Sequence, residues 1–225
     1  MREAVAIEQT RETPWQWLLI VLCIASVAVL CVTFNGGISV GASNHVGLLP
    51  VVRRLLDPNY LPNDFNIALR LYHHRVFAWL IAGLSTLCGE ARGLVVLHVA
   101  GAALLSTALW FLCRALGLSW LAYLTEGVLL ATGFLWTGLG LEENDFIGNP
   151  EVQPPLFAHA FVLLATACAL RQRWRWAAFY AGCTVLFHLQ IGVAFTAMLA
   201  PLYVLRWREW NWRELARLAG CYLLP

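Results

Sequence analysis

The chain contains no lysine, so all 15 basic side chains are arginines. Only 12% of its 225 residues are charged. Soluble globular domains have roughly a quarter of their residues charged. Here 60% of the residues are hydrophobic and the mean hydropathy is +0.67. This composition excludes an ordinary soluble domain and indicates a multi-pass membrane protein. A net charge of +2 also excludes a partner bound by charge alone, so no nucleic acid is expected.

Familiar catalytic and metal-binding motifs are missing as well. The sequence has no P-loop, no GxGxxG fingerprint and no pattern typical of a Ser/His/Asp triad. The seven cysteines all fall in apolar segments, without a CxxC pair or a Cys/His cluster at metal-ligand spacing. We interpret them as small buried hydrophobic side chains.

Long apolar segments are what the sequence does have, and they predict an all-α fold. A membrane-spanning helix needs about 20 apolar residues. The stretch 176–205 is too long for one span and short for two, so we expect two helices that reverse at residues 188–192. The prediction is one polytopic transmembrane helical bundle over residues 1–225, with spans near 15–34, 93–113, 120–139, 156–170, 176–188 and 191–205.

Both ends of the chain bear on this prediction. The first apolar run lacks a small-residue cleavage site, so it is expected to be a retained span rather than a signal peptide. A new apolar run starting at Cys221 is only a few residues long. We therefore expect the sequence to be the N-terminal part of a longer protein.

The segment 76–88 has only 13 apolar residues, a length more typical of an interfacial helix than of a span. With an interfacial 76–88 and a cytoplasmic N-terminus, ten of the fifteen arginines are cytoplasmic, as the positive-inside rule favours. The polar loops then share the outer face. The alternative has 76–88 crossing and the N-terminus outside, and it makes twelve arginines cytoplasmic. Segment length favours the first topology and charge count the second.

A polar island at residues 35–75 interrupts the apolar segments, and it carries the candidate catalytic residues Asp57 and Asp64. Two prolines and two asparagines near them indicate an irregular backbone. A carboxylate at a membrane surface can act as a general base or hold a cation beside a phosphate. The alternative is that these residues only form turns and caps.

Basic and imidazole side chains in the same island are candidate substrate-binding groups. Arg53 and Arg54 match phosphate oxygens in shape and charge, and His45 can transfer a proton or bond a phosphate. Each also has a simpler interpretation, as a lipid-headgroup contact or a filler of an amphipathic helix.

The second polar loop and the helix break supply the remaining candidates. Glu142, Glu143 and Asp145 place three carboxylates within four residues, which favours a divalent cation or a sugar hydroxyl as ligand. His188 and Gln190 lie at the expected break, where broken membrane helices line cavities. Other polar residues within apolar segments must face the protein interior: His98, Glu126 and His159.

The layout of these segments resembles the N-terminal module of the GT-C class of integral-membrane glycosyltransferases. The similar features are one span, a long outer loop ending in an interfacial helix at 77–89, two spans joined by a short turn at 114–117, and an acidic second outer loop. An arginine-rich inner turn and a broken helix pair from Ala181 to His188 follow. The class usually has acidic residues soon after the first span, where this chain has Asn44 and His45.

The resemblance implies a function and a set of roles. Sugar would be transferred from a polyprenyl-phosphate carrier to an acceptor at the outer face, in a bacterial inner membrane. Asp64 or Asp57 would be the base, the acidic cluster of the second loop would assist, and His188 would lie near the donor phosphate. Membrane lipids and the donor lipid are the expected partners. The alternatives are a transporter or flippase-like protein, with His98, Glu126 and His188 along its path, and a non-catalytic membrane protein.

Overall fold

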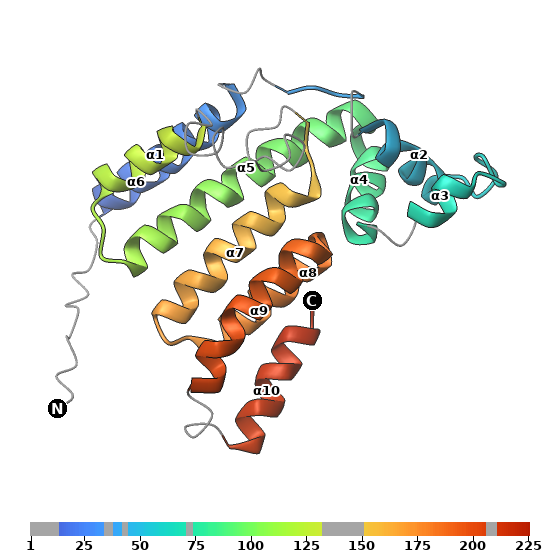
Figure 1. Ribbon diagram of the computed structural model, residues 1–225. Helices are drawn as coiled ribbons and strands as arrows, with labels where there is room; N and C mark the ends of the chain where they lie inside the picture. Colours follow the sequence, from blue (N-terminus) through green and yellow to red (C-terminus); the bar gives the residue numbers. More distant parts are fainter. Residues whose placement is uncertain (1–13, 34–37, 42–44, 71–73, 132–150, 206–210) are drawn as a thin grey trace, which may run out of the picture.

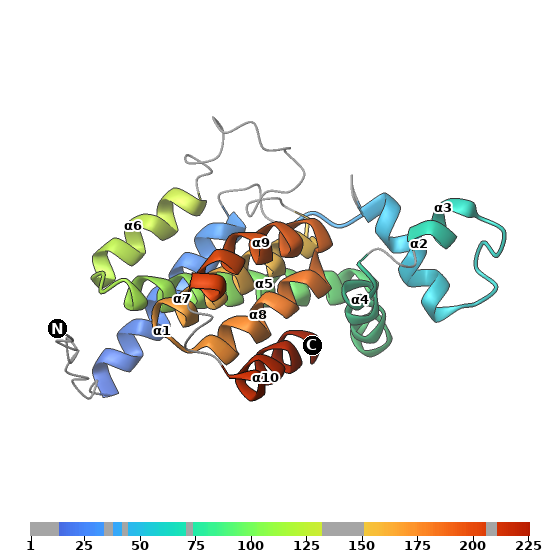
Figure 2. The ribbon, with the colours of Figure 1, turned by 60° about the horizontal axis from the view of Figure 1, so that its bottom comes forward.

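The computed structural model of the chain describes residues 14–33, 38–41, 45–70, 74–131, 151–205 and 211–225 (Figure 1). Every regular element in these ranges is a helix, which confirms the all-α prediction. Most of the helices form a bundle of neighbouring, roughly aligned rods (Figures 1 and 2). The bundle contains α1 (Pro14–Thr33), α5 (Glu90–Ala115), α6 (Trp120–Ala131), α7 (Pro154–Leu170), α8 (Trp174–Phe187), α9 (Leu189–Leu205) and α10 (Trp212–Leu223).

Helices α5 and α7 form the centre of the bundle, and a glycine allows them to pack closely. A Cβ at Gly101 would lie 2.5 Å from Leu156 Cδ2 and 3.1 Å from Phe157 Cζ. Phe157 in turn stacks on Phe187 of α8, with ring centroids 5.1 Å apart. Pro154 and Pro155 begin α7, where the missing N–H groups cost nothing. The main hydrophobic core therefore lies between α5, α7 and the elements at their N-terminal ends.

Helices α8 and α9 reverse direction at a single residue, His188, as the length of the 176–205 segment suggested (Figure 1). His188 has an extended backbone, with φ −150° and ψ 104°. One turn into α9, a Cβ at Gly192 would lie 2.5 Å from Val185 Cα. The two helices thus pack backbone to backbone directly after the reversal.

At one end of the bundle, α4 (Arg75–Cys88) lies across the direction of the other helices (Figures 1 and 2). Only Gly89 separates it from α5, and the glycine adopts φ 87°, a value that L side chains rarely take. Beyond α4 lie α2 (His45–Leu56) and α3 (Phe65–Arg70). From the sequence, these residues were assigned to an interfacial helix and an outer loop.

Within the described part of the chain, two helices are long and apolar enough to cross a membrane, over Trp15–Thr33 and Glu90–Ala115. They correspond to the spans expected near 15–34 and 93–113. Three further apolar helices are shorter: α4, α7 and α9. Helix α6 is described only as far as Ala131, so residues 132–139 of the span expected there lie outside the described residues.

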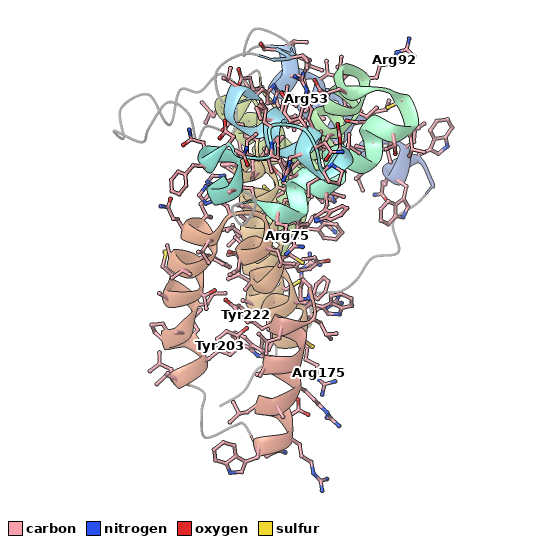
Figure 3. All side chains as sticks on the ribbon, turned by 90° about the vertical axis from the view of Figure 1, so that its right-hand side faces the viewer. Arg53, Arg75, Arg92, Arg175, Tyr203 and Tyr222 are labelled. Carbon is pink, nitrogen blue, oxygen red and sulfur yellow. The ribbon has the colours of Figure 1, made fainter. Side chains whose placement is uncertain are left out.

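The apolar residues from Cys221 onward include the last turn of α10. Asn211 caps this helix, its Oδ1 accepting a hydrogen bond from the Glu214 amide at 2.9 Å. Helix α10 lies against α8 so closely that a Cβ at Gly182 would collide with the Tyr222 carbonyl. The Tyr222 hydroxyl bonds Thr196 Oγ1 of α9 at 3.1 Å, and Figure 3 places Tyr222 between the helices.

Candidate functional site

His45, at the start of α2, ties the first polar loop to the segment before α7. The Gly41 amide donates to its Nδ1 at 3.1 Å, so Nε2 carries the hydrogen and donates to the Val152 carbonyl, also at 3.1 Å. The side chain is fully buried. Both ring nitrogens are occupied by backbone groups, which gives His45 a positioning role where the sequence suggested substrate binding.

His74 makes a second connection, between the start of α4 and the break after α8. Its backbone is left-handed, with φ 53°, and its Nδ1 donates to the Phe187 carbonyl at 3.1 Å. The His74 and His188 rings lie 5.1 Å apart between centroids. His188 Nδ1 also accepts from the Ile191 amide at 3.4 Å. His188, a predicted site residue, therefore meets the first polar loop.

Further polar side chains are buried around these two connections. His98 on α5 lies close enough to His45 to interact with it electrostatically. Glu151 and Gln153 flank Val152, the residue that His45 bonds, and both are almost fully buried. His98 Nδ1 and Gln153 Nε2 have no hydrogen-bond partner among the described residues. Buried polar atoms without partners are rare and costly in proteins.

The sequence placed His98 in the protein interior, and the structure agrees. Glu151 and Gln153 were not recognised as candidates. Little in the sequence marks them as site residues, since polar residues before a Pro-Pro pair are typical of an ordinary exposed helix start. What makes them unusual is their burial on either side of Val152, the residue that His45 bonds.

Asp57 and Asp64, the predicted catalytic pair, lie in the turn between α2 and α3. Asp57 Oδ1 accepts from the Asn59 amide at 2.8 Å, and Asp64 Oδ1 caps α3 by accepting from the Ile67 amide at 3.0 Å. This turn lies at the outer tip of the molecule, away from the bundle (Figures 1 and 2). The two carboxylates therefore do not join the buried histidines, and each uses one oxygen as a turn or cap acceptor.

Arg53 and Arg54 also have local partners. Arg53 forms a two-point ion pair with Glu90, Nε to Oε2 at 3.0 Å and a terminal nitrogen to Oε1 at 2.9 Å. The bond to Glu90 raises the pKa of Arg53 above its usual range. Arg54 donates to the Tyr60 carbonyl at 3.1 Å. Together they tie α2 to the start of α5 and to the turn that holds Asp57; Figure 3 places Arg53 at this end of the molecule.

The remaining candidates are dispersed. Gln190 is exposed in the first turn of α9, and Glu126 is exposed on α6 rather than facing an interior path. His159 is partly buried, and its Nδ1 donates to the Pro155 carbonyl at 2.8 Å. The acidic cluster of Glu142, Glu143 and Asp145 lies outside the described residues. The described residues contain no group of three or more His, Cys, Asp or Glu side chains that could hold a metal ion.

No family model, curated protein or solved structure matches this chain. What can be said about its function therefore rests on its own residues and geometry. The features that carry weight are two connections between distant loops, made by His45 and His74, and a buried polar cluster beside them. All lie at the end of the bundle that α4 covers.

Proposed function

We propose that this chain is a multi-pass membrane protein, or part of one, that transfers a sugar from a polyprenyl phosphate to an acceptor at the outer face of a bacterial inner membrane. The observation that carries the proposal is the meeting of the first polar loop with two later segments at one end of the bundle. The bonds from His45 to Val152 and from His74 to Phe187 span 107 and 113 residues.

Membrane placement is supported by the surface of the bundle. Helix α1 exposes large apolar side chains on several sides, among them Trp17, Leu18, Val21 and Leu22. A helix that is apolar all round is typical of a membrane span or of a deeply buried core, and α1 is mostly exposed. The exposed surfaces of α9 are similar, with Met198 and Val204.

The proposed orientation rests on the length of α4, whose 14 residues are short for a span. The N-terminus is then cytoplasmic, and ten of the fifteen arginines lie on that side. The turns and helix termini at the end opposite α4 hold Arg114, Arg171, Arg173, Arg175 and Arg213. The end with α2, α3 and α4 faces outward, where a polyprenyl-phosphate sugar would be used.

Of the two predicted bases, Asp64 is the better candidate. It is only partly exposed, and capping α3 through Oδ1 fixes its orientation while Oδ2 remains for an acceptor hydroxyl. In the proposed reaction the carboxylate takes the hydroxyl proton and the acceptor oxygen attacks the anomeric carbon. The bond from that carbon to the phosphate oxygen breaks, and polyprenyl phosphate leaves.

The test is Asp64→Asn, because asparagine caps helices as well as aspartate does and so preserves α3. General-base catalysis contributes about 10²- to 10⁴-fold in rate. Release of polyprenyl phosphate from a panel of polyprenyl-phosphate sugars should fall by about that factor. Asp57→Asn is the matched comparison in the same turn. Unchanged turnover in both variants would refute the assignment of the base.

A further inference from the structure

Two buried side chains beside the His45 connection carry polar atoms that no protein group satisfies. His98 on α5 is 4% exposed, and Gln153, the residue before α7, is 6% exposed. His98 Nδ1 and Gln153 Nε2 have no hydrogen-bond partner among the described residues. Native proteins pair nearly all of their buried polar atoms, either with protein groups or with ordered water. These two atoms therefore indicate a ligand.

The packing of α5 against α7 brings the two side chains to the same end of one helix pair. Gly101 meets Leu156, since a Cβ at Gly101 would lie 2.5 Å from Leu156 Cδ2. The two helices run in the same direction (Figure 1). His98 lies three residues before Gly101, and Gln153 lies three residues before Leu156. Both side chains are thus on the α4 side of that contact, at a similar level.

His45 gives a second and independent link between them. Its Nε2 donates to the carbonyl of Val152, the residue before Gln153, at 3.1 Å. His98 lies close enough to His45 to interact with it electrostatically. His98 and Gln153 are therefore both neighbours of one fully buried imidazole ring.

The hydrogen-bonding character of the two atoms decides what can bind. An amide nitrogen only donates, so the ligand must accept a hydrogen bond from Gln153 Nε2, which a metal cation cannot do. An imidazole nitrogen donates or accepts according to its protonation, and a water molecule can serve it in either state. Glu151, buried two residues from Gln153, disfavours an anion. Because more than nine-tenths of each side chain is buried, the ligand must also be small.

We propose that one enclosed water molecule bridges Gln153 Nε2 and His98 Nδ1. Buried waters make about three hydrogen bonds each, typically to polar groups that would otherwise be unsatisfied. The bridge joins the segment before α7 to α5, and it fixes the stretch of chain whose Val152 carbonyl accepts from His45. The water is thus part of the connection between the first polar loop and the bundle. The site requires neither membrane placement nor glycosyl transfer.

A double-mutant cycle tests the bridge. Gln153→Met and His98→Leu remove the polar atoms and keep side chains of similar volume, and Gln153 makes no capping bond that would be lost as well. With the water in place, each single variant leaves the other atom without its partner. The equilibrium constant for unfolding, measured from helical circular dichroism as sodium dodecyl sulfate is added, should then rise about tenfold. The double variant should lose little more than either single variant, because no unpaired atom remains.

Without a bound ligand the signs reverse. Each single variant would then remove an unsatisfied buried atom and make the fold more stable, and the two gains would add. Stabilisation by both single variants would therefore overturn the proposal.

Two further variants separate the bridge from packing. His98→Asn places a polar atom near the position of Nδ1 and should keep most of the stability, whereas a loss as large as that of His98→Leu would contradict the bridge. Thr107→Val is the control on the same helix, because the Thr107 hydroxyl bonds the Ala103 carbonyl of α5 at 2.7 Å. Its effect should add to that of Gln153→Met, and coupling as strong as that with His98→Leu would show that the cycle does not report the bridge.

Direct observation of the water is the second measurement. An experimental structure of the full chain that resolves ordered water should show one peak within about 3.2 Å of both atoms. Two separate peaks, or the elongated density of an organic molecule, would overturn the assignment.

Discussion

Replacing Gly192 by alanine should open the tight reversal between α8 and α9. The added Cβ would lie 2.5 Å from Val185 Cα and 2.6 Å from Val185 N. Carbon atoms in contact are ordinarily about 3.5–4.0 Å apart, so the overlap is about 1 Å. The neighbour is backbone, which cannot rotate away, and the helices must separate.

The magnitude follows from two opposing effects. Overpacking of this kind costs up to about 3 kcal/mol. Alanine is a better helix former than glycine by about 1 kcal/mol, which offsets part of the cost. We therefore expect Gly192→Ala to lower the free energy of unfolding by about 2 kcal/mol.

Gly83→Ala is the matched control, because Gly83 lies inside α4 with no atom within 4 Å of the added Cβ. Only the propensity effect operates there, so the change should raise stability by up to about 1 kcal/mol. The measurement is loss of helical circular dichroism as sodium dodecyl sulfate is added to protein in mixed micelles. If both variants are as stable as the unmodified chain or more stable, α8 and α9 do not approach at Gly192 and the reasoning fails.

Two further predictions concern the ends of the bundle. His45→Ala leaves the buried Val152 carbonyl without its partner, and an unsatisfied buried group costs about 1–3 kcal/mol, so hydrogen exchange around residues 151–153 should accelerate. Unchanged protection there would contradict the positioning role. The hydrogen bond from Arg175 lowers the pKa of Glu214 in the folded chain. The ion pair between them therefore contributes fully to the docking of α10 above the ordinary glutamate pKa of about 4.3. That contribution is lost as the pH falls through the lower pKa of the folded state. Limited proteolysis of α10 between pH 6 and pH 3 should show this loss, and a Glu214→Gln protein that loses protection over the same pH range would argue against it.

One feature that depends on segment length was predicted from the sequence. The reversal at His188 followed from a 30-residue apolar stretch that suits neither one span nor two. Helix α2 was missed, because the whole polar island 35–75 was interpreted as a loop with an irregular backbone around Asp57 and Asp64. Short helices depend on tertiary packing. The buried side of α2, with Leu49 and Val52, provides that packing.

Helix α10 was missed for a different reason. Its start is encoded by Asn211 and Glu214, three residues apart, a spacing typical of a helix N-terminus. The apolar residues from Cys221 onward suggested the start of a separate element, whereas the first three of them belong to α10.

The candidate site was the least predictable part. The sequence analysis expected the polar loops to share one face, but it did not predict the contact between His74 and His188. His45 and Val152 are 107 residues apart, and no sequence motif links two residues at that distance. Glu151 and Gln153 are buried beside that contact, and the pattern of residues around them does not indicate it.

The length of α8 has a consequence for the bilayer itself. Its 14 residues measure about 21 Å at 1.5 Å per residue, whereas the hydrocarbon layer is roughly 30 Å thick. In the proposed placement, His188 would lie some 9 Å short of the outer boundary of that layer. A mismatch of this size is relieved by local thinning. Lipid headgroups would then lie closer to His74 and His188. The phosphate of a lipid carrier would need to move a shorter distance out of its leaflet to reach them.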